Sequence, residues 1–116
     1  MYYIYMVRCA DDSIYTGIAA DLSRRLRQHV EKAPAAAKYT RSRCVTALEC
    51  AWTAEDRSAA SRLESGIKRL TREKKLQLIA DPAALAQLLP HLNDHDYAHL
   101  RGATLEDCLK GELPCI

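Results

Sequence analysis

Short runs of aromatic and β-branched residues come first in the chain and helical patterns follow them. Residues 2–8 and 13–18 have the composition of strands, and a short polar break at 9–12 separates them. This pattern predicts a β-hairpin. Asp21 then stands as a helix N-cap, and we expect its helix to continue to about residue 30.

A third strand is expected over 45–52, followed by two helices. Thr53 and Asp56 have the spacing of a capping box, which predicts Thr53 as the N-cap of a long helix. A further helix is expected over 71–79. Apolar side chains in the first of these helices recur at helical spacing, at Ala60, Leu63, Ile67 and Leu70.

The last third of the chain is patterned less clearly. A helix is expected near 83–89, and beyond Pro90 the breakers Gly102, Gly111 and Pro114 interrupt any periodicity. The sequence therefore predicts an α/β (α+β) fold, with a small three-stranded, mainly antiparallel sheet flanked by helices. We expect residues 1–80 to form the domain and 81–116 to pack on it as an acidic C-terminal extension.

The composition is that of a small protein with reduced thiols. A chain of 116 residues fits one domain and leaves no room for a second catalytic domain. The sequence has no run of 18 apolar residues and no signal-peptide pattern, so we expect a cytoplasmic protein. Its 5 cysteines are odd in number and form no Cys-x-x-Cys pair, which agrees with that expectation.

Charge is distributed unevenly along the chain. Residues 1–75 carry 15 Lys and Arg against 9 Asp and Glu, whereas residues 76–116 carry 2 against 6. A basic body suits a polyanionic partner such as nucleic acid, because phosphate neutralisation supplies most sequence-independent affinity. The acidic tail either solvates the protein or covers part of the basic surface.

Two tyrosine triplets carry the candidate chemistry: Tyr3-Ile4-Tyr5 in the first strand and Tyr15-Thr16-Gly17 in the second. With Arg25 and His29 on the following helix, the chain resembles the GIY-YIG endonuclease superfamily, in particular its small stand-alone members of the YhbQ type. The resemblance extends through a basic loop at 37–41 and a helix at 63–68, and so covers about residues 1–80. Tyr3 stands where many members have Gly, and Thr16 where many have Ile.

The resemblance implies a role for each matching residue. Tyr5 and Tyr15 are the active-site tyrosines, Arg25 binds the phosphate, His29 is a polar residue one turn on, and Glu64 is the ligand of Mg²⁺ or Mn²⁺. A tyrosine hydroxyl of pKa about 10 is almost fully protonated at neutral pH, so little phenolate is present to act as a base. The site is therefore expected to favour the phenolate by nearby positive charge.

Structural interpretations compete with these roles. Strand tyrosines commonly pack, and the chain has 6 Tyr and no Phe to do so. His29 is either a boundary histidine bonded to the sheet or a proton relay. Glu64 and Lys68 are spaced as an ordinary i,i+4 ion pair of an exposed helix.

Basic residues near these positions predict contacts with the nucleic-acid backbone, although solvated surface is the alternative for any charge run. His91, His95 and His99 are spaced for zinc on a helix, but they have no acidic base beside them and poor helix formers between them. The expected substrate-binding residues are Gly17, Lys38, Tyr39, Arg41, Lys68, Lys74 and Lys75.

The hairpin register decides whether the tyrosines can meet one phosphate. An odd-length loop centred on Asp11 would pair Tyr5 with Gly17 and Val7 with Tyr15, placing both phenols on one face. Asp12 would then take a left-handed conformation. We expect this register, with Gly17 leaving room for the substrate backbone.

The function that follows is a metal-dependent endonuclease acting on DNA, structure-selective and serving repair or recombination. A non-catalytic nucleic-acid-binding or partner-recruiting module is the alternative, and a protein-interaction domain is a third. The carboxylate at Glu64 favours catalysis, because a binding module has no need of it.

Overall fold

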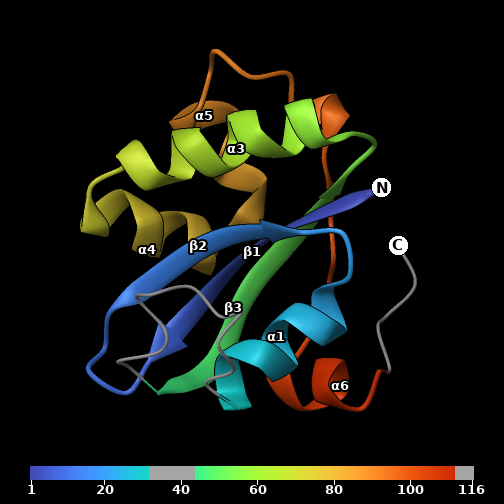
Figure 1. Ribbon diagram of the computed structural model, residues 1–116. Coiled ribbons are helices and arrows are strands. Elements are labelled where there is room, and N and C mark those ends of the chain that lie inside the picture. The colour runs from blue at the N-terminus through green and yellow to red at the C-terminus, as the bar shows by residue number, and fades with distance from the viewer. Residues whose placement is uncertain (32–43, 112–116) are drawn as a thin grey trace.

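The computed structural model describes residues 1–31 and 44–111 (Figure 1), and its centre is an antiparallel sheet of four strands in the order β2-β1-β3-β4. The prediction of three strands was therefore one short. The fourth strand has only two residues, which pair with Trp52 and Thr53, and a pair of residues leaves no periodicity to detect. The strands are β1 (Tyr2–Cys9), β2 (Ile14–Ala19), β3 (Val45–Ala54) and β4 (Ala98–His99).

The β1–β2 hairpin has the predicted register. Tyr5 pairs with Gly17 and Val7 with Tyr15. The loop comprises residues 10–12, and Asp12 adopts the left-handed conformation with φ of 67°. Residues paired in this way point to the same face of the sheet, so the backbone brings both tyrosines to one side.

Helix α1 (Leu22–Glu31) begins where the sequence predicted, because the Asp21 carboxylate accepts a hydrogen bond from the Arg24 amide at 3.1 Å. Its apolar stripe, with Leu22 and Leu26, is fully buried against the sheet. His29 lies in the same stripe, since it is fully buried as well.

The long helix α3 (Arg57–Arg69) begins later than predicted. Asp56 is its N-cap and accepts from the Ala59 amide at 2.8 Å, whereas Thr53 still belongs to β3. Thr53 is drawn into the sheet because both of its neighbours pair with it, Tyr3 of β1 and Ala98 of β4. The next helix, α4 (Arg72–Ala80), has Thr71 as its cap.

The tail contributes short elements to both faces of the sheet. The predicted helix over 83–89 is a 3₁₀ turn, η1 (Pro82–Ala84), continued by α5 (Leu85–Leu88). Two further elements follow, η2 (Asp94–Asp96) and α6 (Leu105–Leu109). Leu85, Leu89 and Tyr97 join one core cluster, and Leu100 and Cys108 join the other.

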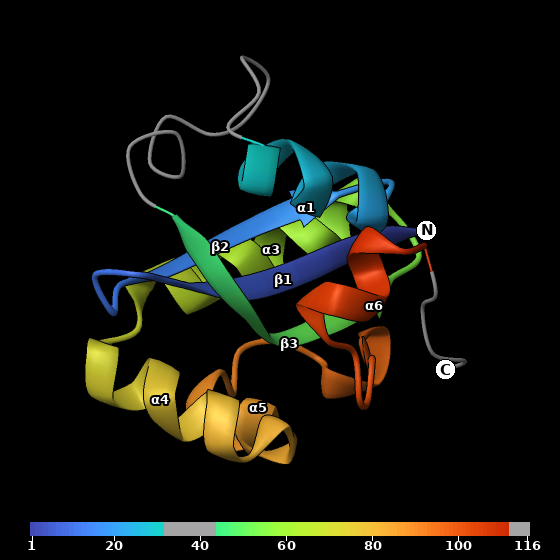
Figure 2. The same ribbon diagram turned by 90° about the horizontal axis from the view of Figure 1, so that it is seen from below.

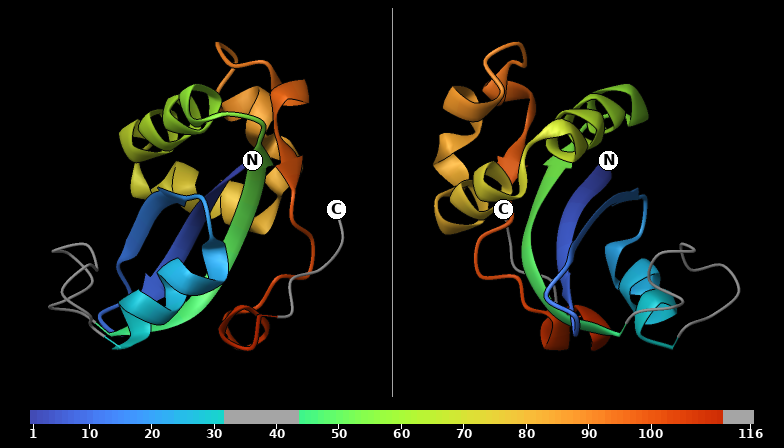
Figure 3. Two further views of the ribbon diagram at one scale, coloured as in Figure 1. Left: turned by 45° about the vertical axis from the view of Figure 1, so that its right-hand side comes forward. Right: turned by 90° about the vertical axis from the view of Figure 1, so that its left-hand side faces the viewer.

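Helices cover the sheet on both sides. Figure 3 shows α3, α4 and α5 on one side of the curved sheet and α1 on the other, and Figure 2 shows α1 beside α6. The first side is packed around Ile4, Met6 and Trp52, and the second around Tyr5, Val7 and Ala51. Among the described residues, no helix has the length and apolar character of a membrane span.

No disulfide joins the cysteines of the described residues. Cys9 and Cys50 are buried in strands, and burial raises the pKa of the Cys50 thiol to about 12. Cys115 lies outside the described residues.

Candidate active site

Tyr5 lies on the central strand β1 and is fully buried. Its hydroxyl is 2.8 Å from Nε2 of His29, across the interface between the sheet and α1. One proton joins the two atoms, and with the imidazole proton on Nδ1 the hydroxyl donates and Nε2 accepts. The structural and functional interpretations of His29 thus apply to the same contact, because its partner in the sheet is the candidate catalytic phenol.

Tyr15 completes a triangle of rings with this pair. Its ring centroid is 6.4 Å from that of Tyr5 and 5.5 Å from that of His29, while the Tyr5 and His29 centroids are 5.8 Å apart. Tyr15 is half-buried, so it forms the outer side of the triangle.

Gly17 leaves the space that the Tyr5 phenol occupies. A Cβ at this position would lie 2.6 Å from the Tyr5 hydroxyl oxygen and 2.8 Å from Cζ, closer than real contacts allow. Glycine is therefore required at position 17 by packing against Tyr5 within the protein. Its expected contact with a substrate backbone stays a prediction.

The site keeps both polar partners uncharged at neutral pH. Burial raises the pKa of Tyr5 strongly, the charge of Tyr15 adds to the rise, and the hydrogen bond and charge of Arg25 oppose it without outweighing it. Burial, with a smaller contribution from Arg25, lowers the pKa of His29 to about 4. Arg25 alone does not favour the phenolate, because desolvation is the larger effect. The contribution expected from a divalent cation on Glu64 stays a prediction.

Arg25 stands at the edge of the triangle. It is half-buried, and its Nη1 donates to Oε1 of Gln28 at 3.0 Å. A hollow of about 260 Å³ beside the end of β2 is lined by Arg24, Arg25 and Gln28, among others. Gln28 is a residue that sequence reasoning missed, although its position three residues after Arg25 is the spacing that brings side chains together on a helix.

Helix α3 presents Glu64 and Lys68 to the same group. The Glu64 carboxylate is 3.4 Å from Nζ of Lys68, and that ammonium lies 5.9 Å from the centroid of the Tyr15 ring. The negative charge of Glu64 also acts on Tyr5, whose pKa it raises slightly. The i,i+4 pair therefore exists, and it lies at the candidate site.

Glu64 is the carboxylate that the described part of the site offers to a magnesium ion, so the site fits this ion only with a single protein carboxylate as ligand. Mg²⁺ commonly takes one or two carboxylates, with water and phosphate oxygens as the other ligands. The Glu64 side chain is 22% exposed, so its oxygens can be reached. Within 1–31 and 44–111 the structure has no group of three His, Cys, Asp or Glu side chains placed to hold a metal.

Some of the remaining residues predicted to bind substrate or metal lie within the described part of the structure, and others lie outside it. Lys74 is exposed and Lys75 is half-buried on α4, beyond the C-terminal end of α3. Lys38, Tyr39 and Arg41 lie outside the described residues. The three histidines of the tail share no helix, because His91 is in a turn, His95 in η2 and His99 in β4.

A charged network that the sequence did not reveal holds the hairpin loop. Asp12 pairs with Nη1 of Arg8 at 2.7 Å and with Nη2 of Arg72 at 2.9 Å, which connects the loop to α4. Arg8 also approaches Glu49 at 3.5 Å. Arg72 thus has a structural partner in the hairpin loop.

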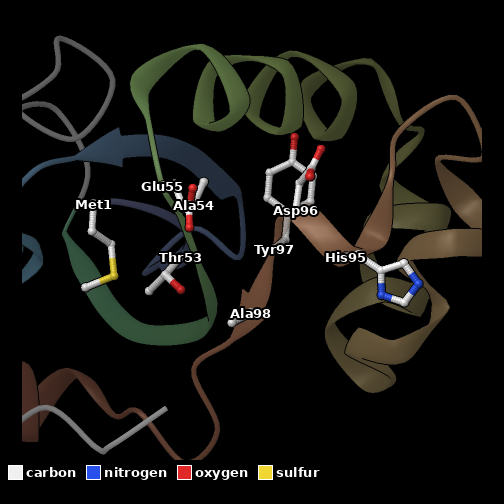
Figure 4. A pocket seen from close by; sticks show the side chains of 8 residues that line it. All are labelled: Met1, Thr53, Ala54, Glu55, His95, Asp96, Tyr97 and Ala98. Carbon is white, nitrogen blue, oxygen red and sulfur yellow. The ribbon is translucent and has the colours of Figure 1, made fainter.

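A hollow of about 640 Å³ lies elsewhere in the molecule. Figure 4 shows Met1 and Thr53 on one side of it and Asp96 with Tyr97 on the other. None of the candidate catalytic residues lines it, and the Tyr97 hydroxyl donates to the Ala59 carbonyl at 2.7 Å. The size of a hollow is therefore a poor guide to the chemistry of this molecule.

Comparison with known proteins shows which family the chain belongs to. A family model described as the GIY-YIG catalytic domain matches residues 1–77. A UPF0213 protein of Fusobacterium nucleatum is 43% identical over 81 residues, which is 70% of this chain and 79% of the relative. The UPF0213 protein YhbQ of Salmonella arizonae is 40% identical over 91 residues, 78% of this chain and 89% of the relative.

Among solved structures, the solution NMR structure of a UPF0213 protein from Bacillus halodurans has 38% sequence identity to this chain. The match covers 69% of this chain and 84% of that one, with a TM-score of 0.45. The curated relatives confirm the resemblance to small stand-alone proteins of the YhbQ type.

Proposed function

Because the chain belongs to the GIY-YIG catalytic domain family, a family of nucleases, we propose that it is a metal-dependent endonuclease hydrolysing phosphodiester bonds in DNA. The observation that carries this proposal is the contact between the Tyr5 hydroxyl and Nε2 of His29 at 2.8 Å. It places a proton donor and a neutral acceptor side by side, next to an arginine and a carboxylate.

Tyr5 is proposed to pass a proton rather than to act as a preformed phenolate. As the attacking water loses its proton to the Tyr5 oxygen, the phenolic proton moves to Nε2 of His29, which is neutral at pH 7 and able to accept it. The phenol stays uncharged throughout, so its raised pKa does not prevent the transfer.

The Tyr5 hydroxyl must be opened to its substrate. The side chain is fully buried, whereas Tyr15 on the outer side of the triangle is half-buried. A movement of the Tyr15 ring would expose the hydroxyl, and contacts of this kind commonly tighten only when substrate is bound. Tyr15 is then placed to orient the water and the phosphate.

Arg25 is proposed to bind the phosphate that is cut. Its guanidinium is half-buried, lines the hollow beside β2 and already interacts with Tyr5. A planar guanidinium can donate two parallel hydrogen bonds to phosphate oxygens and oppose the charge that develops on them.

Glu64 would hold the metal, with Lys68 as its neighbour. A bound Mg²⁺ or Mn²⁺ supplies Lewis-acid polarisation of the phosphate and a more acidic water. Lys68 lies between the carboxylate and the Tyr15 ring, so it is placed to contact the substrate phosphate once Glu64 has another partner.

We propose that the substrate is a branched, nicked or single-stranded DNA. Such structures arise in DNA repair and recombination, which is the role proposed for the enzyme. The support is the basic character of residues 1–75, together with the exposed Lys74 and the half-buried Lys75 near α3. The expected contacts of Lys38, Tyr39 and Arg41 belong to the same proposal.

The test is a panel of flapped, branched, single-stranded and duplex DNA incubated with untagged protein in Mg²⁺, in Mn²⁺ and in EDTA. Cleavage of at least one structure with a divalent cation and none in EDTA is the expected result. Cleavage that persists in EDTA would contradict the metal dependence.

A non-catalytic binding module is the second candidate, and one observation favours it. Glu64 is already paired with Lys68, and Tyr5 is fully buried, as expected of structural residues. Binding to the same panel without cleavage in either metal would support this candidate.

A further inference from the structure

The outward face of α3 is rich in cationic side chains and serines. Between Arg57 and Arg69 the helix has four cationic side chains and a single acidic one, Glu64. Its exposed positions are otherwise occupied by serines. Figure 1 shows α3 along the outside of the molecule, with α5 beside it.

A hollow of about 400 Å³ lies along this face, between α3 and the segment that follows α5. Gly66 forms part of its floor, where a Cβ would already contact Leu89 at 3.2 Å. The lining offers hydrogen-bond donors and, among the described residues, no carboxylate. It is formed by Ser58, Ser61, Arg62, Ser65, Gly66, Arg69, His91 and Leu92.

The hollow lies further around α3 from the candidate active site. At 100° per residue, Ser61 and Ser65 lie about 60° and 100° from Glu64, and Arg69 and Arg62 lie about 140° and 160° from it. Lys68, at about 40° on the same scale, stands between the carboxylate and the serines. A chain of donors thus leads from the Tyr15 ring to the hollow.

We propose that this face of α3 is a track for the backbone of a DNA strand, leading away from the phosphate at the Tyr5 site. This inference rests on the proposed function for the identity of its partner. Arginine and serine are among the side chains that donate to phosphate oxygens, and such contacts carry no sequence information. From Ser58 to Arg69 the face is about 16 Å long, which matches the rise of about five nucleotides in one strand of a duplex.

Acidic side chains mark where the track ends. Glu55, Asp56 and Asp96 line an adjoining hollow at the N-terminal end of α3, where Arg62 is the neighbouring cation. A phosphate backbone is repelled there, so the strand leaves the groove at this end of α3, near Ser58 and Arg62, and runs toward Arg69 at the other end. The exposed Lys74 and the half-buried Lys75 of α4 lie beyond that end.

The experiment measures the salt dependence of binding to a duplex and a single strand of about 30 nucleotides, in EDTA so that no cleavage occurs. Each lost phosphate contact makes the slope of log K against log salt less steep by about 1. Arg62→Gln with Arg69→Gln should therefore reduce the slope by about 2. The matched control, Arg101→Gln with Lys110→Gln, changes net charge equally and should leave the slope almost unchanged.

A slope for Arg62→Gln with Arg69→Gln equal to that of the wild type, or equal to that of the control, would overturn the track. Both arginines are exposed, and the Arg62 guanidinium donates to Oγ of Ser58 on the surface, so the fold should survive their loss. Ser65→Asp adds a carboxylate to the groove and gives an independent reading, with weaker binding expected and unchanged binding contradicting the proposal.

Failure of the proposed function is distinguishable from failure of the track. Absence of cleavage by the wild type on every substrate would reject the nuclease, and the slopes would still decide the track. Normal wild-type cleavage with unchanged slopes would reject only the track.

Discussion

The Tyr5 hydroxyl and Nε2 of His29 lie 2.8 Å apart, and both side chains are fully buried. The pair is at once part of the core and the centre of the candidate chemistry. Its burial explains why Tyr5 stays protonated and why His29 stays neutral, since desolvation is the first cause of both pKa shifts.

The burial of His29 predicts a pH dependence of stability. Its pKa is about 4 in the folded protein and near 6.5 in the unfolded chain, so below pH 6.5 the unfolded state binds the extra proton. The free energy of unfolding should fall by roughly 3 kcal/mol as the pH goes from 7 to 4. Urea unfolding at several pH values measures this.

The control for that experiment is His29→Gln, which keeps a polar side chain but cannot take up a proton in this range. The part of the pH dependence that belongs to His29 should disappear in this variant. An identical pH profile in the variant and the wild type would show that His29 is not the titrating group.

Thr16 carries a buried hydroxyl with no hydrogen-bond partner among the described residues, and it is 3% exposed. Replacing it by the isosteric Val removes the cost of burying that group, which is about 1–3 kcal/mol for an unsatisfied polar atom. Thr16→Val should therefore raise the midpoint of thermal unfolding. Thr53→Val is the matched control. Thr53 is a buried threonine of the same sheet, and its hydroxyl is not among the unsatisfied buried groups, so this substitution should not raise the midpoint.

Gly17→Ala should disturb the Tyr5 hydroxyl, because the new Cβ would lie 2.6 Å from its oxygen. Overpacking of this kind costs about 1–3 kcal/mol, and displacement of Tyr5 should also reduce cleavage. Gly102→Ala provides the comparison, since nothing lies near that Cβ and only the positive φ of 71° opposes it. It should cost about 1 kcal/mol and leave cleavage intact. Equal cleavage by Gly17→Ala and Gly102→Ala would contradict the close contact.

Lys68→Met should change metal binding and cleavage in opposite directions. The Lys68 ammonium is 3.4 Å from Glu64, so its removal leaves the carboxylate free for a cation. Titration with Mn²⁺, followed by its electron paramagnetic resonance signal, should show tighter binding to the variant, while cleavage falls because the phosphate loses a contact. Lys110→Met, which breaks the Lys110 pair with Glu106 on α6, is the control. Weaker or unchanged Mn²⁺ binding to Lys68→Met would mean that Glu64 is not the ligand.

The hairpin and the helices of the candidate site could be predicted from the sequence because their signals are local. An odd number of residues in the hairpin loop fixes which residues of the two strands pair. Tyr5 and Tyr15 could therefore be placed on one face of the sheet from the sequence. Asp21 could be recognised as a cap for the same reason, since its partner is only three residues away.

Long-range effects account for what the sequence did not show. Thr53 has the local pattern of an N-cap, but pairing with Tyr3 and Ala98 keeps it in β3 and moves the cap to Asp56. The pKa of Tyr5 depends on how deeply it is buried, which no spacing reports. Strand β4 has two residues and exists only because β3 offers an edge.

The measurement that tests the central claim most directly is single-turnover cleavage of a flapped DNA in Mg²⁺ by Tyr5→Phe, with Tyr3→Phe as control on the same strand and face. Tyr5→Phe removes the hydroxyl that contacts His29 and should lower the cleavage rate by at least about 100-fold, the lower range for a positioned acid or base, while DNA binding in EDTA is unchanged. Tyr3→Phe should cleave as the wild type does. Cleavage by Tyr5→Phe at the rate of Tyr3→Phe would contradict the account.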